Sequence, residues 1–361
     1  MKSYKRTYTL PFKFDIPNYT SDFILKNSFL ATYFKFLRRF LYLLFKNQSK
    51  LEVEKIKSRH QKILWINISA PSLGDSIMDL SSRALLKGRL IDLYTDKKNS
   101  HIFVNDRVFN NIYTQADELE EISYDLVILD SFSSRSIRVK SKLAPSTQFV
   151  GMFGYYNGPE VNRVLFSFHR MNHLLGYIKS EHEVNLLSKA SLKISDQDAQ
   201  LVSNLNLPLN YISIAIGGEW SYRTYQKWDE VIRLLINMDK KLKIVLIGSN
   251  NASKLSEELL KKLDLDNVIS YVGNFTFMQT AEIINKSQLL ICCDGGLMHA
   301  ANALGTPILT MFARLTPDMQ LTESIISFSL FDKSDVNNIS PGEIIKEYSK
   351  FIKFAHNHLQ S

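Results

Sequence analysis

The sequence contains few cysteines and no long apolar run, and each shortage excludes a class of protein. Its two cysteines, Cys292 and Cys293, are adjacent within an apolar segment. Neighbouring cysteines rarely pair with each other, so we expect no disulfide framework and a reducing compartment. The longest apolar run near the N-terminus, Phe40 to Phe45, is far too short to cross a bilayer or to form the core of a signal peptide.

Common phosphate and metal motifs are missing as well. No segment matches the P-loop pattern G-x-x-x-x-G-K-[ST] or the dinucleotide pattern G-x-G-x-x-G. No Asp-x-Asp pair stands at the end of an expected strand. The sequence therefore predicts neither a P-loop nucleotide site nor a bound metal ion or other cofactor.

Charge is unevenly distributed along the chain. The protein has 361 residues and a formal net charge of +8. The first 62 residues hold 14 Lys and Arg against 4 Asp and Glu, whereas the remaining 299 hold 30 against 32. The basicity therefore belongs to an N-terminal arm, residues 1–61. This pattern argues against a nucleic-acid-binding surface and favours an anionic partner that meets the arm.

The arm contains a basic, aromatic-rich segment, FILKNSFLATYFKFLRRFLYLLFKN, from Phe23 to Asn47. Its apolar residues are interrupted by Lys26, Lys35, Arg38, Arg39 and Lys46. A helix of this kind can lie on an anionic membrane surface. It can equally pack on the protein body with its cations in solvent. The sequence leaves both alternatives open.

From Lys62 onward, apolar runs alternate with amphipathic segments, and the length of the chain predicts two domains. Apolar strands separated by helices indicate parallel sheets covered on both faces. In the first domain, 62–207, we expect strands at 62–69, 90–95, 125–130 and 147–153 and helices at 75–87, 169–190 and 195–205. In the second, 208–340, we expect strands at 211–217, 243–248, 268–273, 289–294 and 308–312 and helices at 226–238, 252–263 and 278–286.

The C-terminal part completes this α/β fold. Strand 308–312 is expected to close the second sheet, and the segment 341–361 contains a helix, 341–356, expected to return to the first domain. Two doubly wound, Rossmann-like domains that face a cleft bind ligands at the carboxyl ends of their strands. Three polar segments of the sequence stand at such ends.

The first polar segment, SAPSLGDSIMDL, runs from Ser69 to Leu80 after the first strand. Ser72, Leu73 and Gly74 form the turn, and Asp75 stands at the start of the next helix. A carboxylate there can cap the backbone N–H groups of the helix. It can also accept a proton from an attacking hydroxyl group.

The second polar segment, AIGGEWSYRTYQKWDEVI, runs from Ala215 to Ile232. Its two glycines are followed by residues that can donate to phosphate oxygens: Ser221, Arg223, Thr224 and Lys227. The alternative is a solvated loop with Trp228 as an anchor in the core.

The third polar segment, ICCDGGLMHAANALGTPIL, runs from Ile291 to Leu309. Asp294 and Gly305 can cap its short helix. Helical spacing puts Leu297, Ala300, Ala301 and Leu304 on one face and His299 on the opposite side, outside the core. The N–H groups of Gly295 and Gly296, together with the helix dipole, form a candidate anion site.

A basic cluster, SSRSIRVKSK, spans Ser133 to Lys142. It carries Arg135, Arg138, Lys140 and Lys142. The cluster can bind an acidic sugar or a phosphate, or it can be a solvated loop.

Over roughly residues 62–355 the chain resembles glycosyltransferase family 9, the lipopolysaccharide heptosyltransferases. SLGD at 72–75 looks like the S-x-G-D turn of the family. The loop 217–228 is similar to its phosphate-binding Lys/Arg-Arg-Trp-Pro segment, although Thr224-Tyr225-Gln226 replace Arg-Trp-Pro. DGGLMHAANALGTP at 294–307 is similar to its most specific signature, with Gly295 in place of the commoner threonine.

The resemblance implies a GT-B fold, an ADP-heptose donor in the second domain and a Kdo-containing lipid A type acceptor in the first. Asp75 matches the general base of the family, and Arg223 falls at the place of the cation on the donor phosphates. The other implied donor-binding residues are Gly217, Ser221, Thr224, Asp294, Gly295, Gly296 and His299. The implied acceptor-binding residues are Ser72, Gly74, Arg135, Arg138 and Lys140.

The resulting hypothesis is an inverting, metal-independent glycosyltransferase without a cofactor. We expect it to act on lipooligosaccharide core at the cytoplasmic face of the inner membrane, held there by its arm and without a nucleic acid partner. Two alternatives remain. One is a family member that uses another nucleotide sugar, and the other is a non-catalytic protein that binds nucleotide sugars.

Overall fold

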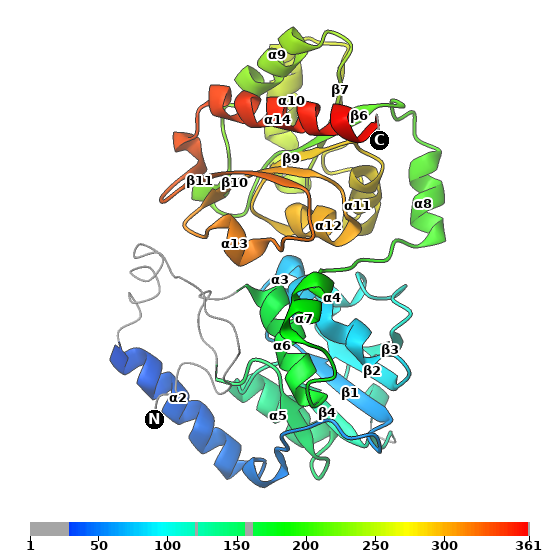
Figure 1. Ribbon diagram of the computed structural model, residues 1–361, viewed down its shortest axis with the longest axis vertical. Coiled ribbons are helices and arrows are strands. Elements are labelled where there is room, and N and C mark those ends of the chain that lie inside the picture. The colour runs from blue at the N-terminus through cyan, green and yellow to red at the C-terminus, as the bar shows by residue number, and fades with distance from the viewer. Residues whose placement is uncertain (1–28, 120–121, 156–161, 360–361) are drawn as a thin grey trace. The chain divides into compact units, whose positions relative to one another are not determined.

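The computed structural model describes residues 29–119, 122–155 and 162–359. The chain divides into two compact units, Met1–Lys193 and Ile194–Ser361 (Figure 1). The described residues of each unit form a parallel sheet and the helices that cover it. The α/β fold with two doubly wound parts is therefore confirmed.

The sheet of the first unit has five strands in the order β3-β2-β1-β4-β5. Its strands are β1 Lys62–Asn67, β2 Leu90–Thr95, β3 Phe109–Tyr113, β4 Leu126–Leu129 and β5 Phe149–Gly151. All neighbours are parallel, with Ile63 of β1 opposite both Ile91 and Leu126. The strand order reverses at β1, so the switch point, where such sheets bind ligands, lies between β1 and β4.

Both faces of this sheet are buried, as the apolar runs predict. Leu64 and Ile66 pack in a cluster with Ile137 of the helix after β4, and Ile63 and Trp65 point to the other face and are also buried. The helices of the unit are α2 Phe29–Phe45, α3 Leu73–Asp79, α4 Lys97–Ser100, α5 Ser134–Leu143, α6 Arg163–Leu174 and α7 Glu181–Leu187, with 3-10 turns at Ser49–Leu51, Ser81–Leu86 and Asp117–Leu119.

The sheet of the second unit has six parallel strands in the order β11-β10-β9-β6-β7-β8. Its strands are β6 Tyr211–Ala215, β7 Lys243–Ile247, β8 Val268–Ser270, β9 Leu290–Cys293, β10 Ile308–Ala313 and β11 Ser327–Asp332. Here the order reverses at β6, which puts the switch point between β6 and β9.

Helices cover this second sheet on both faces (Figure 1). They are α8 Asp196–Ser203, α9 Trp228–Met238, α10 Ser253–Leu263, α11 Phe277–Asn285, α12 Gly296–Leu304, α13 Pro317–Gln320 and α14 Pro341–Leu359, with 3-10 turns at Ser221–Arg223, Asn250–Ala252 and Val336–Asn338. One core cluster joins β-sheet residues to α9, α10 and α14, and the other joins them to α8, α11 and α12.

Two expected domain boundaries are wrong. The first unit ends at Lys193 and not at 207, because Val202 of α8 is fully buried in the second unit's core. The C-terminal helix α14 buries Ile344, Tyr348 and Phe351 in that same unit. Its apolar face is used there, so the expected return to the first half does not occur.

Several elements were not expected from the sequence, among them β3, β11 and α5. Strand 308–312 does not close the second sheet, because β11 pairs with β10 along its far side. The edge strands β3 and β11 are only partly buried and therefore lack a continuous apolar run. The basic cluster at 133–142 forms helix α5, capped by Ser133, rather than a loop.

Helix α2 packs on the first unit. Leu43 is buried in the core cluster, and the ring of Phe36 contacts that of Tyr155 with centroids 4.7 Å apart. The alternative in which this segment packs on the body is therefore confirmed, while membrane contact stays a prediction. No helix among the described residues is long and apolar enough to cross a membrane. The rest of the expected arm, residues 1–28 with Lys26, lies outside the described residues.

Candidate active site

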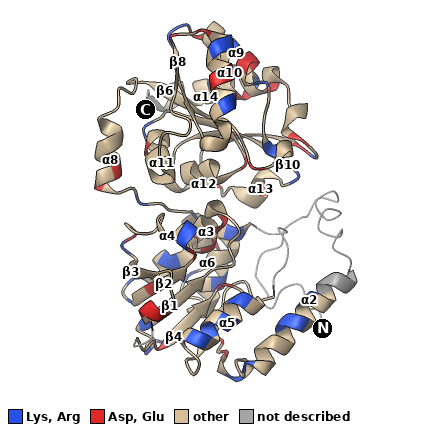
Figure 2. Ribbon diagram, turned by 180° about the vertical axis from the view of Figure 1, so that it is seen from behind, with Lys and Arg blue, Asp and Glu red and all other residues tan. Residues whose placement is uncertain are grey.

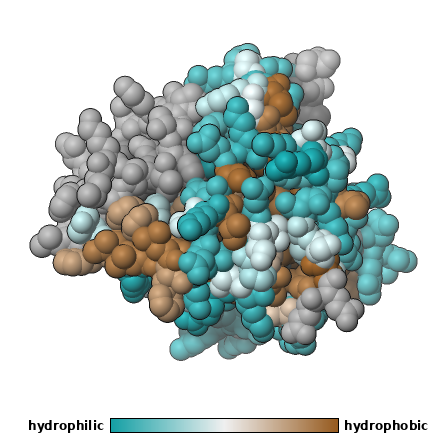
Figure 3. Space-filling view, turned by 90° about the horizontal axis from the view of Figure 1, so that it is seen from below, coloured by the Kyte–Doolittle hydropathy of each residue, from teal (hydrophilic) through white to brown (hydrophobic). Residues whose placement is uncertain are grey.

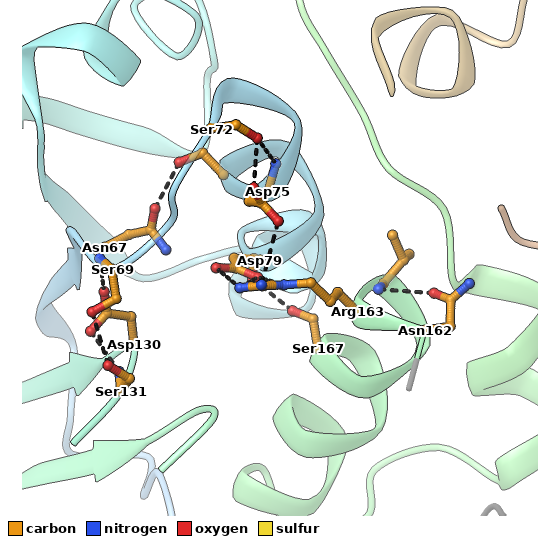
Figure 4. A network of polar contacts seen from close by, with 12 residues as sticks. Asn67, Ser69, Ser72, Asp75, Asp79, Asp130, Ser131, Asn162, Arg163 and Ser167 are labelled. Carbon is orange, nitrogen blue, oxygen red and sulfur yellow. Dashed lines mark hydrogen bonds and ion pairs between the residues drawn. The ribbon is translucent and has the colours of Figure 1, made fainter. Parts of the chain in front are cut away.

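The switch point of the first sheet is held together by Asp130. This carboxylate follows β4, is buried, and accepts from the backbone N–H groups of Ile68 and Ser69 at 2.8 and 2.7 Å (Figure 4). Burial raises its pKa, while these hydrogen bonds act in the opposite direction. The Ser69 hydroxyl lies 2.9 Å from that of Ser131. The segment that leads from β1 to α3 is thus fixed against the end of β4.

Asp75 lies at the start of α3 and does not cap it. Ser72 is the cap, and its hydroxyl oxygen accepts from the Asp75 N–H at 3.3 Å. The same hydroxyl donates to the Asp75 carboxylate at 2.6 Å. Gly74 is buried within the helix. The capping alternative for Asp75 is therefore wrong, and its side chain, 21% exposed, is available for another role.

A second acid and an arginine complete this group. Arg163, at the start of α6, donates to both oxygens of Asp79 at 2.7 and 2.6 Å, and its guanidinium lies 3.4 Å from Asp75 (Figure 4). The Asp79 side chain is 3% exposed. Burial raises the pKa of Asp79 to about 7, and the charge of Arg163 opposes the shift.

Arg163 and Asp79 were missed in the sequence. Asp75 and Asp79 are four residues apart, so the helix puts both on one face, and this spacing was the available signal. Arg163 is about ninety positions further along the chain, and no local pattern joins it to α3.

The expected acceptor-side cations lie in three different places. Arg135 is 61% exposed, donates to the Ile68 carbonyl at 3.0 Å and pairs with Asp96. It therefore reaches the loop that leads to Asp75. Arg138 is exposed and its Nε lies 3.4 Å from the Tyr42 hydroxyl of α2.

Lys140 is not an acceptor-binding residue. It is 1% exposed, its ammonium donates to Gln48 at 2.5 Å, and it lies 5.2 Å from the centre of the Phe149 ring. Burial lowers its pKa to about 8. The prediction was wrong because helix α5 turns Lys140 toward the core, whereas a loop would have left it in solvent.

At the switch point of the second sheet, Arg223 meets Asp294. The arginine comes from the loop after β6, the carboxylate follows β9, and the two are 2.7 Å apart. The Asp294 side chain is 3% exposed and that of Arg223 is 23% exposed. His299 Nε2 lies 3.9 Å from Asp294. Three of the predicted donor-binding residues are thus brought together.

Two expectations about this turn are wrong. Asp294 does not cap α12, because Gly295 occupies the cap position and no side chain caps the helix there. His299 does not lie outside the core, since it is 5% exposed. The buried face of α12 is wider than the apolar stripe of its sequence and includes His299. The imidazole of this residue points toward Asp294. Gly305, in contrast, ends the helix in the left-handed conformation as expected.

The glycines of this site have different surroundings. Gly217 has φ +87°, and a Cβ there would lie 2.6 Å from that of Ala252. A Cβ on Gly295 would meet nothing within 4 Å, and one on Gly296 only the ring of Phe277 at 3.6 Å. The α12 start therefore has open space beside Gly295, next to the backbone N–H groups that a helix leaves unbonded in its first turn.

The loop after β6 is anchored by aromatic residues. Trp228 and Tyr225 are both 1% exposed, with rings 5.1 Å apart. The alternative with Trp228 as a core anchor is therefore confirmed for that residue. Thr224 donates its hydroxyl to the Trp220 carbonyl at 2.9 Å, and Ser221 begins the 3-10 turn that contains Arg223.

The described residues hold no group of three or more His, Cys, Asp and Glu side chains that could bind a metal ion. The adjacent Cys292 and Cys293 are buried free thiols of β9.

Two comparisons with known proteins find glycosyltransferase family 9. No curated protein sequence matches the chain. The family model described as glycosyltransferase family 9 (heptosyltransferase) matches residues 156–328. The resemblance to glycosyltransferase family 9 is confirmed. The chain is therefore a glycosyltransferase, although Asp75 lies outside the matched residues.

Solved structures establish the fold of the chain. A family 9 glycosyltransferase from Veillonella parvula is similar with a TM-score of 0.65 and 15% identity, over 80% of this chain and 97% of that one. The E. coli ADP-heptose lipopolysaccharide heptosyltransferase II has a TM-score of 0.64 and 18% identity, over 82% and 99%. The E. coli heptosyltransferase WaaC, solved with ADP, has a TM-score of 0.59 and 14% identity, over 80% and 99%. The expected GT-B type of α/β fold is confirmed.

Proposed function

We propose that this glycosyltransferase moves heptose from ADP-heptose to a Kdo-containing acceptor of the lipopolysaccharide inner core, with inversion and without a metal ion. The donor proposal is supported by relatives that bind such molecules: WaaC has been solved with an ADP-heptose analogue and TibC with ADP-D-β-D-heptose. The single observation that carries the mechanism is the position of Asp75 at the switch point of the first sheet.

Asp75 acts as the general base. Its carboxylate is partly exposed and is oriented by the Ser72 hydroxyl and by Arg163. It accepts the proton of an acceptor hydroxyl while that oxygen attacks the anomeric carbon of the donor. The bond from this carbon to the diphosphate breaks on the opposite side, which inverts the configuration. A positioned base contributes about 10²–10⁴-fold to the rate.

Arg223 and the start of α12 stabilise the leaving diphosphate. Asp294 holds the guanidinium of Arg223 at the carboxyl edge of the sheet, and 23% of that side chain is exposed. The first-turn N–H groups and the dipole of α12 favour an anion at the same edge. Protein cations and backbone dipoles can therefore neutralise the charge that develops on ADP.

The basic surface of Arg135 suits an acidic acceptor. Its side chain is 61% exposed, and its guanidinium is tied to the loop between β1 and α3 by the Ile68 carbonyl. A Kdo carboxylate or a phosphate is the kind of group that arginine binds bidentately. Because this acceptor is a lipid, we place the enzyme at the cytoplasmic face of the inner membrane.

A different nucleotide sugar is the second candidate donor. The observation that favours it is the open space beside Gly295, where the family more often has threonine. A donor with a larger group beside position 295 would fit next to Gly295. The threonine that is commoner in the family would leave less room for it.

Donor binding is tested by thermal shift with ADP-heptose, UDP-glucose and GDP-mannose, because a ligand that binds only the native state raises the unfolding temperature. We expect a shift with ADP-heptose alone. A shift with UDP-glucose or GDP-mannose instead would refute the proposed donor and support the second candidate.

The base is tested with Asp75→Asn, using the exposed Asp117→Asn as a matched control. We expect turnover to fall about 10²–10⁴-fold with an unchanged thermal shift from the donor, and the control to behave like the wild type. Normal turnover of Asp75→Asn would show that another group removes the proton. A wild type that binds the donor but never transfers it would favour a non-catalytic protein.

A further inference from the structure

Helix α2 buries one side against the first unit and leaves a second apolar side in solvent. Leu43 is 3% exposed within the core, and Phe36 packs against the same cluster. The opposite side carries an apolar row that we call the outer stripe. It consists of Phe34, Leu41, Leu44 and Phe45, which are 62%, 53%, 42% and 78% exposed.

The outer stripe is a contiguous patch rather than scattered exposed residues. Positions 34, 41 and 45 are seven and four residues apart, a spacing that puts them on one helix face. Figure 3 shows hydrophobic residues gathered on this side of the first unit. Their exposure means that no element among the described residues covers them. Patches of this kind mark surfaces that meet another apolar phase.

On α2 and its neighbour α5, the charged residues beside the outer stripe are all positive. Neither α2 nor its neighbour α5 contains an Asp or a Glu, and both carry several cations (Figure 2). Lys35 and Arg38 of α2 are exposed, and Arg138 of α5 reaches Tyr42 of α2. Partial burial and the neighbouring charges of Arg39 and Arg38 lower the pKa of Lys35. An anionic partner would relieve this repulsion.

We propose that α2 is an interfacial anchor that inserts its outer stripe into an anionic lipid bilayer and lies along the surface without crossing it. An apolar face with cations beside it is the pattern of helices that bind anionic membranes in this way. The helix has 17 residues, so it lies along about 25 Å of membrane surface. A second copy of the chain fits less well, because its α2 would bring the same positive charges to the contact.

The inference deepens the proposed membrane location, but vesicle binding needs no sugar substrate. Its failure and the failure of the proposed activity are therefore separate results. Deleting the helix would be a poor test, because Leu43 and Gln48 are buried in the body of the first unit. Substitutions confined to exposed side chains are needed instead.

The experiment measures co-sedimentation of the full chain with vesicles. One set contains phosphatidylglycerol and phosphatidylethanolamine, and the other contains phosphatidylcholine alone. We expect binding to the anionic set and at least tenfold weaker binding to the neutral set. The triple variant F34S/L41S/F45S should bind the anionic set at least tenfold more weakly. Each neutralised cation should cost about fivefold, so K35Q/R38Q should lose about 25-fold in low salt.

Two matched control variants replace exposed leucines or exposed lysines that lie outside α2. L186S/L209S changes leucines that are 67% and 98% exposed outside α2, and K254Q/K261Q changes two exposed lysines of α10. Both should bind like the wild type. Undiminished binding of F34S/L41S/F45S, equal binding of the wild type to both vesicle sets, or no binding at all would overturn the proposal. A dimer that the triple variant converts to a monomer, with vesicle binding unchanged, would identify a second copy as the partner.

Discussion

We expect the unfolding free energy of the variant Arg163→Met to depend on pH in a specific way. Arg163 donates to both oxygens of the Asp79 carboxylate, which is 3% exposed. Methionine keeps the apolar stem of the side chain but removes the charged guanidinium, whose Cζ lies 5.1 Å from the centre of the Phe153 ring. An ionised Asp79 would then be buried without its partner, which costs about 3–5 kcal/mol.

Protonation of Asp79 limits this cost at low pH. Burial raises its pKa to about 7 although Arg163 opposes the shift, so removal of Arg163 raises the pKa further. An aspartate in the unfolded chain has a pKa of about 3.9. Between these values the folded variant binds a proton that the unfolded chain does not, so its stability falls as the pH rises. The slope is at most about 1.4 kcal/mol per pH unit.

The double variant D79N/R163M isolates this effect, because it lacks the titrating carboxyl group. We expect the double variant to be the more stable of the two, and its advantage in unfolding free energy to grow by up to about 3 kcal/mol between pH 5.5 and pH 8. Urea unfolding at both pH values measures the difference, and hydrogen exchange of peptides from α3 and α6 locates it. An equal difference at pH 5.5 and pH 8 would refute the reasoning.

Three further predictions concern other residues. Arg223→Gln should weaken donor binding about tenfold or more in a thermal-shift titration, because hydrogen bonds to charged groups contribute about 1.5–3 kcal/mol; unchanged binding would contradict its role. Lys140 has a lowered pKa of about 8, so the wild type should gain stability as the pH rises from 8 toward 10, and K140M should show no such gain. Gly217→Ala should lower the unfolding temperature because of its φ of +87° and the close Ala252, whereas Gly295→Ala should leave it unchanged; equal effects would contradict this account.

The sequence predicted the central strands well because they are buried on both faces. Strands β1, β2, β6 and β7 start at the residues expected from their apolar runs. The edge strands β3 and β11 are half exposed and contain polar residues, so they lack the signal on which the prediction depends. The position of α14 could not be predicted either. Its apolar face can pack on any exposed apolar surface, and only the tertiary structure determines which surface lies within its reach.

The candidate site was predicted in part for a similar reason. Motif spacing identified Asp75, Arg223 and Asp294, since each lies next to a strand end. It did not identify which side chains meet. Lys140 was taken for a binding residue because a basic run gives no indication of the helix phase that turns one of its members inward. Arg163 was missed because its partners are distant in the sequence.

Both switch points use the same arrangement of charges. Asp79 and Asp294 are each 3% exposed, and each binds an arginine, Arg163 or Arg223, that is 23% exposed. A buried carboxylate fixes the guanidinium in one orientation and neutralises part of its charge, so little side-chain entropy remains to be lost when a ligand binds. In this interpretation the aspartate of the D-G-G turn orients the cation, and the arginine meets the donor. Asp294→Asn should therefore weaken donor binding only while Arg223 is present, which a double-mutant cycle with Arg223→Gln measures as a coupling of about 0.5–3 kcal/mol.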